Sequence, residues 1–567
     1  MNRSVIDVLR SVLVTARRLA PESQDSRAGH LHLRRDRWPC DPSQRQGEEA
    51  AAEYGRAGQE PPAQGLLMTT CRDVCCCLAV VLALQSCVVR DAWAQNVSNT
   101  ITRQAEGAKA PTSADTSVDG VAAVGDSVDS ADHQGTANQR WNVHFQNTDI
   151  AEFAAPFAAR YSGTHSLTNQ GQARETLSTD VFTGARLWSG GEIHSDVLVW
   201  QGYGLSRSFG IENFPDADGY KVGTTPPNVM FARLLLQQTF GFGGDQEDVA
   251  DGPLTLATRE DVSRLTLYLG RMSALDIMDH NKYAGDGHLQ FMSWAGTANA
   301  TWDYGQDTVG YETGVAVNLN QRRWALRYSF FLMPPYVNTD NTGSGDGGDD
   351  QVLTYPPRGR YGPLTKSWAM ASEYERRFTI ARRPGAVRLL AWLDSAKTVD
   401  YDVGAAVLST LGAATDLTPY EAYHHSYGLA VNAEQEITPQ VGIFSRAGWN
   451  DGKAQSLEFT DMNRLFSLGI HVDGALWSRP HDTFGVAGFL SGASKDNQAY
   501  LAAGGLGILE GDGALRYGPE LSLTPYYDAE LRTGLHVAVQ YQLTDHPNFN
   551  RNRGPASTVM IRFHYER

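Results

Sequence analysis

The residues that most constrain the fold lie at the C-terminal end of the chain, where apolar side chains occupy every second position. This alternation runs through Leu535–Leu543 and again through Thr558–Tyr565. A period of two places all the apolar side chains on one face of a β-strand and the others on the opposite face. Asp545–Asn548 and Arg553–Pro555, between the two stretches, are typical of turns and loops. The chain is therefore predicted to end in an antiparallel hairpin with one apolar face.

Such a hairpin fits two classes of protein. Its apolar face can pack on the core of a soluble β-sandwich, or it can contact the lipid around a transmembrane barrel. Alternation alone does not distinguish the two, so the rest of the chain has to decide.

Charge and hydropathy argue against two other classes of protein, nucleic-acid-binding proteins and helical membrane proteins. The formal net charge of -16 argues against a nucleic-acid partner, which requires a basic surface. The mean hydropathy is -0.36, and no uncharged apolar run approaches the roughly 18 residues of a membrane-spanning helix. A helical membrane protein is thus disfavoured. A barrel stays open, because half of the side chains in each barrel strand are polar.

All cysteines precede residue 88, so the chain beyond them can form neither a disulfide nor a thiolate metal site. They are Cys40, Cys71, Cys75, Cys76, Cys77 and Cys87.

Residues 68–94 have the layout of a secretory signal peptide. The basic residue Arg72 precedes the apolar run Val74–Leu84, and the small-residue motif Ala92–Ala94 follows it. Cleavage after this motif would make Gln95 the first mature residue. A buried core helix is the alternative for the apolar run. Lipoprotein processing at Cys87 is a further one, although the preceding Gln85 fits it poorly.

Two segments flank the signal peptide. Residues 1–67 are interpreted as an N-terminal extension that need not be translated, with the start at Met68. A genuine extended leader and an organelle-targeting segment around Arg3–Arg18 are the alternatives. Residues 95–140 contain few aromatic residues and cannot bury enough apolar surface to fold alone, which predicts a flexible periplasmic segment.

Residues 141–567 are predicted to form one domain of short β-strands separated by turns. At about 10 residues per membrane strand, this length suits a transmembrane antiparallel β-barrel of about 16 strands. A short helix is expected only at Ala151–Arg160. The alternating runs are Trp141–Gln146, Leu177–Leu187, Val229–Phe240, Arg264–Leu269, Trp324–Phe331, Val387–Asp394, Tyr427–Ala433, Val441–Trp449 and Leu468–Val472.

Several blocks of this domain resemble the carbohydrate-selective porins of the OprB family, in family order. The blocks are Ala232–Gly241, Leu269–Asp276, Asn281–Ala284, Gln290–Met292, Arg446–Lys453, Tyr500–Gly505 and Phe549–Pro555. The resemblance implies a barrel in the bacterial outer membrane through which mono- and small oligosaccharides diffuse. Outer-membrane lipid and the barrel-assembly machinery are then the expected partners. The chain departs from the usual pattern in ending on Arg567 rather than on an aromatic residue.

A sugar-selective pore needs charged or amide groups that replace water at the hydroxyls, and aromatic rings that cover the apolar sugar face. By alternation Arg327 lies opposite its apolar neighbours, and Arg388 shares a face with Trp392. An arginine at the midplane on the lipid side would cost about 2–4 kcal/mol, which favours the lumen. The simpler interpretation of each arginine is a solvated wall position or an ion pair. The pore-lining candidates are Arg233, Arg264, Arg327, Glu373, Arg388, Trp392, Arg446, Trp449 and Asp451.

No motif for catalysis, a cofactor or a metal stands out. The chain lacks G-x-S-x-G, H-E-x-x-H and P-loop motifs. Asn338–Asp350 weakly resembles a calcium loop but lacks the final glutamate, so we interpret it as a solvated extracellular loop. The main hypothesis is a sugar porin without catalytic activity. A general diffusion porin, an outer-membrane barrel hydrolase and a soluble secreted β-sandwich binding protein are the alternatives.

Overall fold

The computed structural model describes residues 138–218, 227–306, 310–333, 362–457 and 460–567. All of these belong to one compact unit. The predictions made for residues 1–67, for the signal peptide at 68–94, for nearly all of 95–140 and for Asn338–Asp350 fall outside the described residues.

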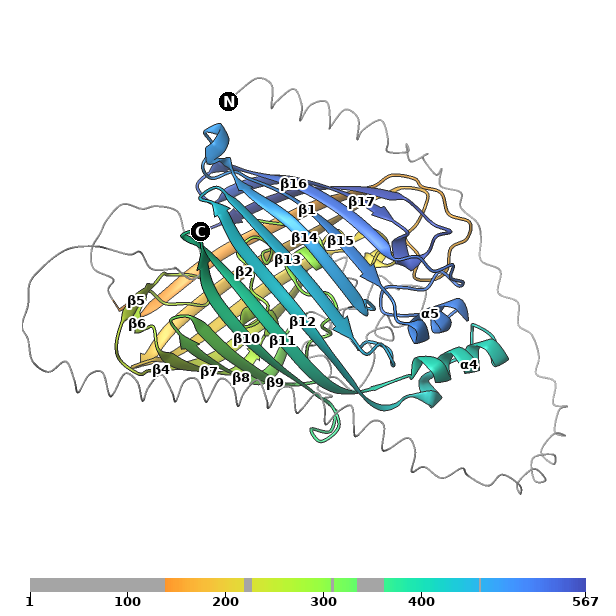
Figure 1. The fold of residues 1–567 in the computed structure, drawn as a ribbon, viewed down its shortest axis with the longest axis horizontal. Helices are drawn as coiled ribbons and strands as arrows, with labels where there is room; N and C mark the ends of the chain where they lie inside the picture. The colour runs from red at the N-terminus through yellow and green to blue at the C-terminus, as the bar shows by residue number, and fades with distance from the viewer. Residues whose placement is uncertain (1–137, 219–226, 307–309, 334–361, 458–459) are drawn as a thin grey trace, which may run out of the picture. The chain divides into compact units, whose positions relative to one another are not determined.

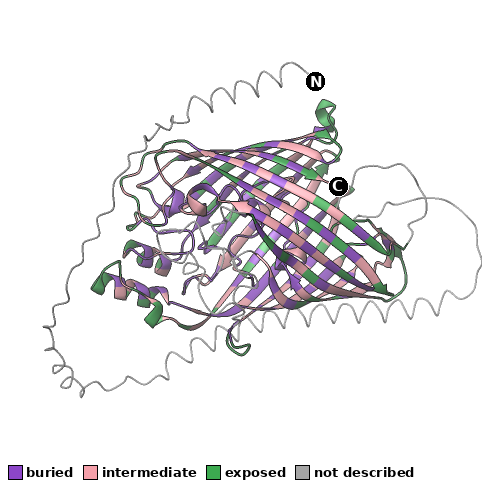
Figure 2. Ribbon diagram, turned by 180° about the vertical axis from the view of Figure 1, so that it is seen from behind, coloured by how far each residue is buried: buried purple, intermediate pink, exposed green. Residues whose placement is uncertain are grey.

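The C-terminal hairpin has the two faces that its alternation predicts. β17 (Leu535–Asp545) pairs with β18 (Ala556–Glu566) in antiparallel register, with Val539 opposite Ile561. Val539 is 42% exposed on the outer face, whereas its neighbour Ala538 is fully buried on the inner face. The same striping of buried and more exposed positions runs along the other strands (Figure 2).

Sixteen antiparallel strands close into a barrel, as the sequence predicts (Figure 1). Closure comes from β1 (Trp141–Ala154), which pairs with both β2 and β18. Between β2 and β17 the barrel strands are β2 (Gln172–Trp188), β3 (Gly191–Gly202), β4 (Asn228–Gly241), β7 (Arg264–Met272), β8 (Glu312–Gln321), β9 (Trp324–Leu332), β10 (Trp368–Ile380), β11 (Arg383–Thr398), β12 (Ala422–Thr438), β13 (Val441–Asn450), β14 (Arg464–Asp473), β15 (Thr483–Gly492) and β16 (Glu520–Arg532).

The two ends of the barrel differ. Turns of two residues join β8 to β9 and β10 to β11 at one end, together with the small sheet of β5 (Gln246–Val249) and β6 (Thr258–Asp261). Longer connections at the other end carry α4 (Tyr401–Leu411) and α5 (Lys495–Ala502), which lie near each other (Figure 1). Short turns face the periplasm and long loops face outward in bacterial barrels. We therefore call the two ends periplasmic and extracellular.

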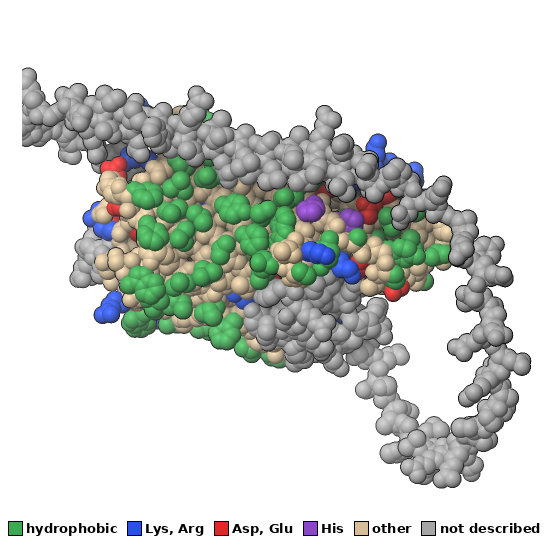
Figure 3. All heavy atoms as spheres, turned by 90° about the horizontal axis from the view of Figure 1, so that it is seen from below, with side chains coloured by type: hydrophobic (Ala, Val, Ile, Leu, Met, Phe, Trp, Pro, Cys, Tyr) green, Lys and Arg blue, Asp and Glu red, His purple; other side chains and the backbone are tan. Residues whose placement is uncertain are grey.

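The outer surface of the barrel is apolar. Hydrophobic side chains cover much of the wall in the view from below (Figure 3). Exposed aromatic residues gather near the periplasmic turns, where amphipathic and apolar rings meet the membrane boundary. They include Trp141, Trp188, Phe240, Phe484 and Tyr565.

The interior is filled by side chains and by long extracellular connections that fold inward. The largest of these is residues 273–306, here called the inner loop, which contains α3 (Trp294–Thr297). Phe291 of this loop is fully buried, and its ring centre lies 4.7 Å from that of Tyr526 and 5.5 Å from that of Phe444 on the wall. The hydrophobic core is therefore inside the barrel, between wall and loop.

All nine alternating runs are strands, but with longer bounds than predicted. The expected helix at Ala151–Arg160 is wrong, because β1 continues to Ala154 and pairs there with β2 and β18. Short 3-10 turns occur at Leu205–Ser208, Ala274–Asp276, Thr418–Tyr420, Gly474–Trp477 and Pro547–Phe549. No helix in the described residues is long and apolar enough to span a membrane.

Candidate functional site

Arginine and glutamate side chains alternate across the inner wall from β9 to β12. Arg327 Nη1 on β9 lies 2.6 Å from Glu373 Oε1 and 3.1 Å from Glu375 Oε2, both on β10. Alternation along β9 explains the orientation, since Leu326 and Tyr328 take the other face. The guanidinium is thus held by two carboxylates inside the barrel.

The row of charges continues from Glu375 to the next two strands. Arg388 on β11 donates from Nε to Glu375 Oε2 at 2.9 Å and pairs with Glu434 of β12 at 3.1 Å. Glu375 Oε2 therefore lies between two arginines. Each desolvated charge in the row has a partner of opposite sign, which offsets the cost of removing it from water. We call Arg327, Glu375, Arg388 and Glu434 the wall row.

Arginine side chains beside the wall row become more accessible toward the periplasmic turns. The side chains of Arg327 and Arg388 are 9% and 8% exposed. Arg377 on β10 is 28% exposed and Arg383, beside the β10–β11 turn, is 37% exposed. The two arginines of the wall row are therefore nearly buried, whereas the side chains on their periplasmic side are open to water.

The inner loop presents two polar residues to this part of the wall. Lys282 donates its backbone N–H to Glu434 at 2.7 Å, and its Nζ lies 3.6 Å from Glu436. His280 is exposed to the lumen. Because protein surrounds it inside the barrel, burial lowers the pKa of His280 below its ordinary value, and Arg327 and Arg388 lower it further. A neutral imidazole therefore faces the wall row near pH 7.

Asp279 fixes this part of the inner loop to the wall. Its backbone N–H donates to Glu373 at 2.7 Å, and its carboxylate accepts from Asn432 of β12 at 2.7 Å. Asp279 has a φ of 59°, a left-handed conformation that is uncommon outside glycine. These contacts compensate for that conformation and hold His280 and Lys282 beside the wall row.

Arg446 of β13 is the second anchor. It is fully buried, its Nε lies 3.2 Å from Asp279 Oδ2, and its Nη1 donates to the carbonyl of Gly296 at 3.3 Å. A side chain with no exposed surface holds the loop and does not contact the water-filled path.

The comparisons with known proteins agree with this geometry. The model of the carbohydrate-selective porin family OprB matches residues 164–566. The chain belongs to the OprB family of carbohydrate-selective porins.

A solved structure shares the fold. The structure of Pseudomonas putida OprB at high pH has a TM-score of 0.55 and 15% identity, covering 76% of this chain and 94% of that one. Its low-pH structure has a TM-score of 0.39 and 10% identity, covering 76% and 93%. No curated protein matches the chain. This porin is accordingly a channel of the bacterial outer membrane and not an enzyme.

Two other candidate arginines of the porin lie away from the wall row. A β-bulge in β4 turns both Ala232 and Arg233 inward, and Arg233 pairs with Asp196 at 2.6 Å and Asp276 at 2.8 Å. Arg264 pairs with Glu247 at 2.6 Å, beside the small β5–β6 sheet. The first holds the start of the inner loop, and the second lies at the periplasmic rim.

Among the remaining pore-lining candidates, Trp392 and Trp449 lie on opposite faces of the barrel wall. Trp392 is buried inside the porin, with its ring centre 6.3 Å from that of Trp302. Trp449 takes the outer phase of β13, where its ring centre lies 5.7 Å from that of Tyr427. Asp451 follows β13, and burial raises its pKa to about 6. The structure therefore separates Arg446 from Trp449.

Sequence reasoning did not identify the inner-loop residues that lie beside the wall row, nor the two wall-row carboxylates. Glu375 and Glu434 could have been found, since each shares the inward phase of a polar neighbour, Glu373 and Asn432 respectively. His280 and Lys282 carry no local signal, because their positions depend on where the inner loop packs.

Proposed function

We propose that the wall row and the facing residues His280 and Lys282 form the constriction through which mono- and small oligosaccharides diffuse into the periplasm. The observation that carries this proposal is the bridging carboxylate. Glu375 Oε2 lies 3.1 Å from Arg327 Nη1 and 2.9 Å from Arg388 Nε. Charges of opposite sign are thereby held side by side along one wall.

A paired row suits a neutral polyol better than an ion. Opposite charges at hydrogen-bond distance cancel at longer range, so the row gives a passing ion little net attraction. It still offers donors and acceptors at close range. Arg327 meets both carboxylates through Nη1, so neither contact uses its Nε or Nη2. Guanidinium N–H groups and carboxylate oxygens can both replace water at sugar hydroxyls.

The contacts must also release the sugar. Conduction requires binding that is favourable enough for entry and weak enough for exit. Both arginines of the row are mostly covered by their carboxylate partners, which leaves each with only a few groups for the sugar. Arg446 and Arg233, which hold the inner loop, are proposed to shape the constriction without contacting the sugar.

Two partners belong to the same proposal. The apolar outer face of β17 and β18 is expected to contact outer-membrane lipid, and the alternating Phe563 and Tyr565 are expected to be read by the barrel-assembly machinery. The support is the outward orientation of both aromatic residues.

The test is sugar block of the ion current in planar bilayers. Replacing Arg327 or Arg388 with alanine should raise the sugar concentration for half-block about tenfold, because a hydrogen bond to a charged group is worth about 1.5 kcal/mol. Ion conductance should stay the same or rise. Arg383→Ala, in the same wall but beside the turn, is the matched control. Its sugar concentration for half-block should equal that of wild type.

Two results would contradict parts of the proposal. If no sugar blocks the wild-type current at any concentration, the channel acts as a general diffusion porin. If block is unchanged in both wall-row variants, sugars pass elsewhere in the lumen.

A further inference from the structure

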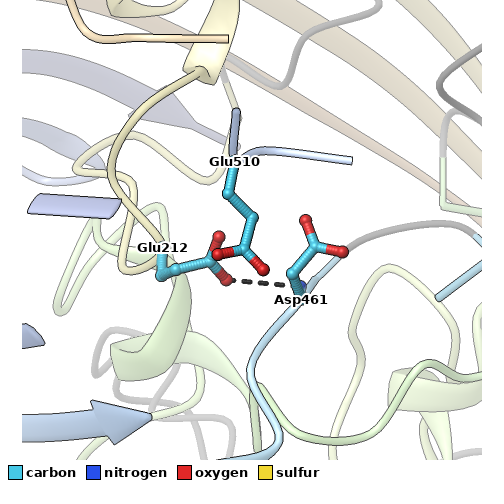
Figure 4. A group of neighbouring side chains, drawn as sticks. All are labelled: Glu212, Asp461 and Glu510. Atoms are coloured by element: carbon cyan, nitrogen blue, oxygen red, sulfur yellow. Dashed lines mark hydrogen bonds between the residues drawn. The ribbon is translucent and has the colours of Figure 1, made fainter. Parts of the chain in front are cut away.

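Three buried carboxylates converge inside the barrel from three different connections. Glu212 lies between β3 and β4, Asp461 between β13 and β14, and Glu510 between β15 and β16. All three are fully buried, and one oxygen of each lies within 4.8 Å of those of the others. Figure 4 shows the Glu510 carboxyl group between those of Glu212 and Asp461.

Each carboxylate accepts a hydrogen bond that orients it. Glu212 Oε2 accepts from the backbone N–H of Asp461 at 3.2 Å, and Asp461 Oδ2 accepts from that of Leu509 at 2.9 Å. Glu510 Oε1 accepts from Asn497 Nδ2 at 2.8 Å. The group is therefore held in place by its surroundings and is not a set of freely rotating side chains.

Two oxygens of this cluster lack a hydrogen-bond donor among the described residues. Glu212 Oε1 and Glu510 Oε2 are buried and accept no hydrogen bond from any described residue. The hydroxyl of Tyr401 is likewise buried and unbonded among the described residues, and it interacts electrostatically with all three acids. Buried polar atoms in folded proteins are almost always bonded, and a missing ion or water is a usual explanation for exceptions.

The charges of Glu212 and Glu510 also lack compensation among the described residues. In the described part of the chain, no lysine, arginine or histidine forms an ion pair with Glu212 or Glu510. Burial raises the pKa of both groups well above the ordinary value, and the neighbouring carboxylates raise it further. Nearby Glu520 differs, because the backbone N–H groups of Glu212, Asn213 and Asn548 donate to it. Glu212 and Glu510 thus need a positive partner that the described residues do not supply.

We propose that Glu212, Asp461 and Glu510 bind a calcium ion that ties three inward-folded connections together. The site offers only oxygen ligands, whereas zinc prefers nitrogen and sulfur. Two oxygens on opposite sides of a calcium ion are about 4.8 Å apart, since calcium–oxygen distances are about 2.4 Å. Magnesium requires about 2.1 Å and keeps several waters, which a buried cluster accommodates less well.

Calcium binding is tested on the full chain in detergent after EDTA treatment and dialysis into micromolar calcium with excess magnesium. Wild type should retain one calcium per chain, and calcium should raise its thermal midpoint. The double variant Glu212→Gln, Glu510→Gln should retain none and show no shift. Asp496→Asn is the matched control, since Asp496 lies in the Glu510 connection but pairs with Lys453 at the surface. It should behave like wild type.

A second variant covers the case in which the double variant does not fold. Glu510→Gln alone should bind calcium at least about tenfold more weakly, because calcium affinity follows the number of charged ligands. Wild-type protein that binds no calcium would overturn the proposal and indicate that the acids share protons instead. Equal calcium binding by wild type and Glu510→Gln would overturn it as well.

Discussion

Arg446 Nε lies 3.2 Å from Asp279 Oδ2, and both side chains are almost completely shielded from solvent. One residue belongs to the barrel wall and the other to the inner loop. A sequence-based interpretation of Arg446 as a pore-lining group gives way here to a role as an anchor, because a guanidinium with no exposed surface cannot reach a passing sugar.

Removing this anchor should loosen the inner loop. Arg446→Met leaves Asp279 buried without its partner, and breaking a buried pair in this way costs about 3–5 kcal/mol. Unfolding in denaturant should report the loss of stability, and single-channel recordings should show a larger or noisier current. Arg383→Met removes an exposed pair with Glu436 and should cost less than about 1 kcal/mol. Equal losses in the two variants would contradict an anchoring role.

The outer face of β17 should respond to charge according to depth. Val539→Arg is expected to cost about 2–4 kcal/mol if the site is near the membrane midplane, because an arginine there leaves water for hydrocarbon. Leu535→Arg, on the same face beside the periplasmic turn, should cost about 1 kcal/mol or less. Folding into lipid vesicles measures both. Similar costs at the two positions would count against a membrane barrel in this orientation.

The inner face of the β17–β18 hairpin is unsuited as a control for the effect of an added charge. Ala538 and Met560 pack against Met292 of the inner loop. An arginine at either position would overfill this contact, so a loss of stability there would report packing and not membrane depth.

Stability should fall at alkaline pH through His288 of the inner loop. Burial lowers its pKa, but Asp218, 3.3 Å away, together with Asp286 and Asp180, outweighs burial and raises the pKa to about 9. Since this exceeds the ordinary value near 6.5, protonated His288 contributes its full stabilisation below about pH 6.5 and loses it as pH rises through about 9. Thermal midpoints of wild type and His288→Gln from pH 6 to pH 10 test this. The gap between them should close with rising pH, and a constant gap would exclude His288.

The mature chain is predicted to begin at Gln95, after the motif Ala92–Ala94. N-terminal sequencing of protein from the outer-membrane fraction measures it. Ala94→Arg should slow cleavage, because the site requires a small residue, whereas Cys87→Ser should leave cleavage unchanged. A lipid-modified Cys87, or a mature chain that retains residues before Met68, would contradict the prediction.

Alternation along single strands was sufficient to predict much of the barrel. It oriented Arg327 and Arg388 toward the lumen and Val539 toward the outside, because the phase of a strand is a local property. Strands β3, β8, β10, β15 and β16 escaped notice as strands, since their inward positions mix small, apolar and charged residues as the interior packing demands.

Local phase along β13 separates two residues that the sequence analysis had grouped. Trp449 was grouped with Arg446 as a pore-lining candidate, yet an odd separation along β13 turns it to the opposite face. The bulge in β4 had the reverse effect, since it directs Arg233 inward beside the buried Ala232. Such bulges follow from how a strand pairs with its neighbours.

The sequence by itself determined the class of fold, the family and the face on which most strand residues lie, because these depend on patterns within about ten residues. Only the tertiary structure decided what fills the barrel. Arg446 meets Asp279 across 167 positions of the chain, and Glu212 meets Asp461 across 249. Contacts of that range depend on barrel closure and on how the connections pack inside it, and neither leaves a periodic signal in the residues themselves.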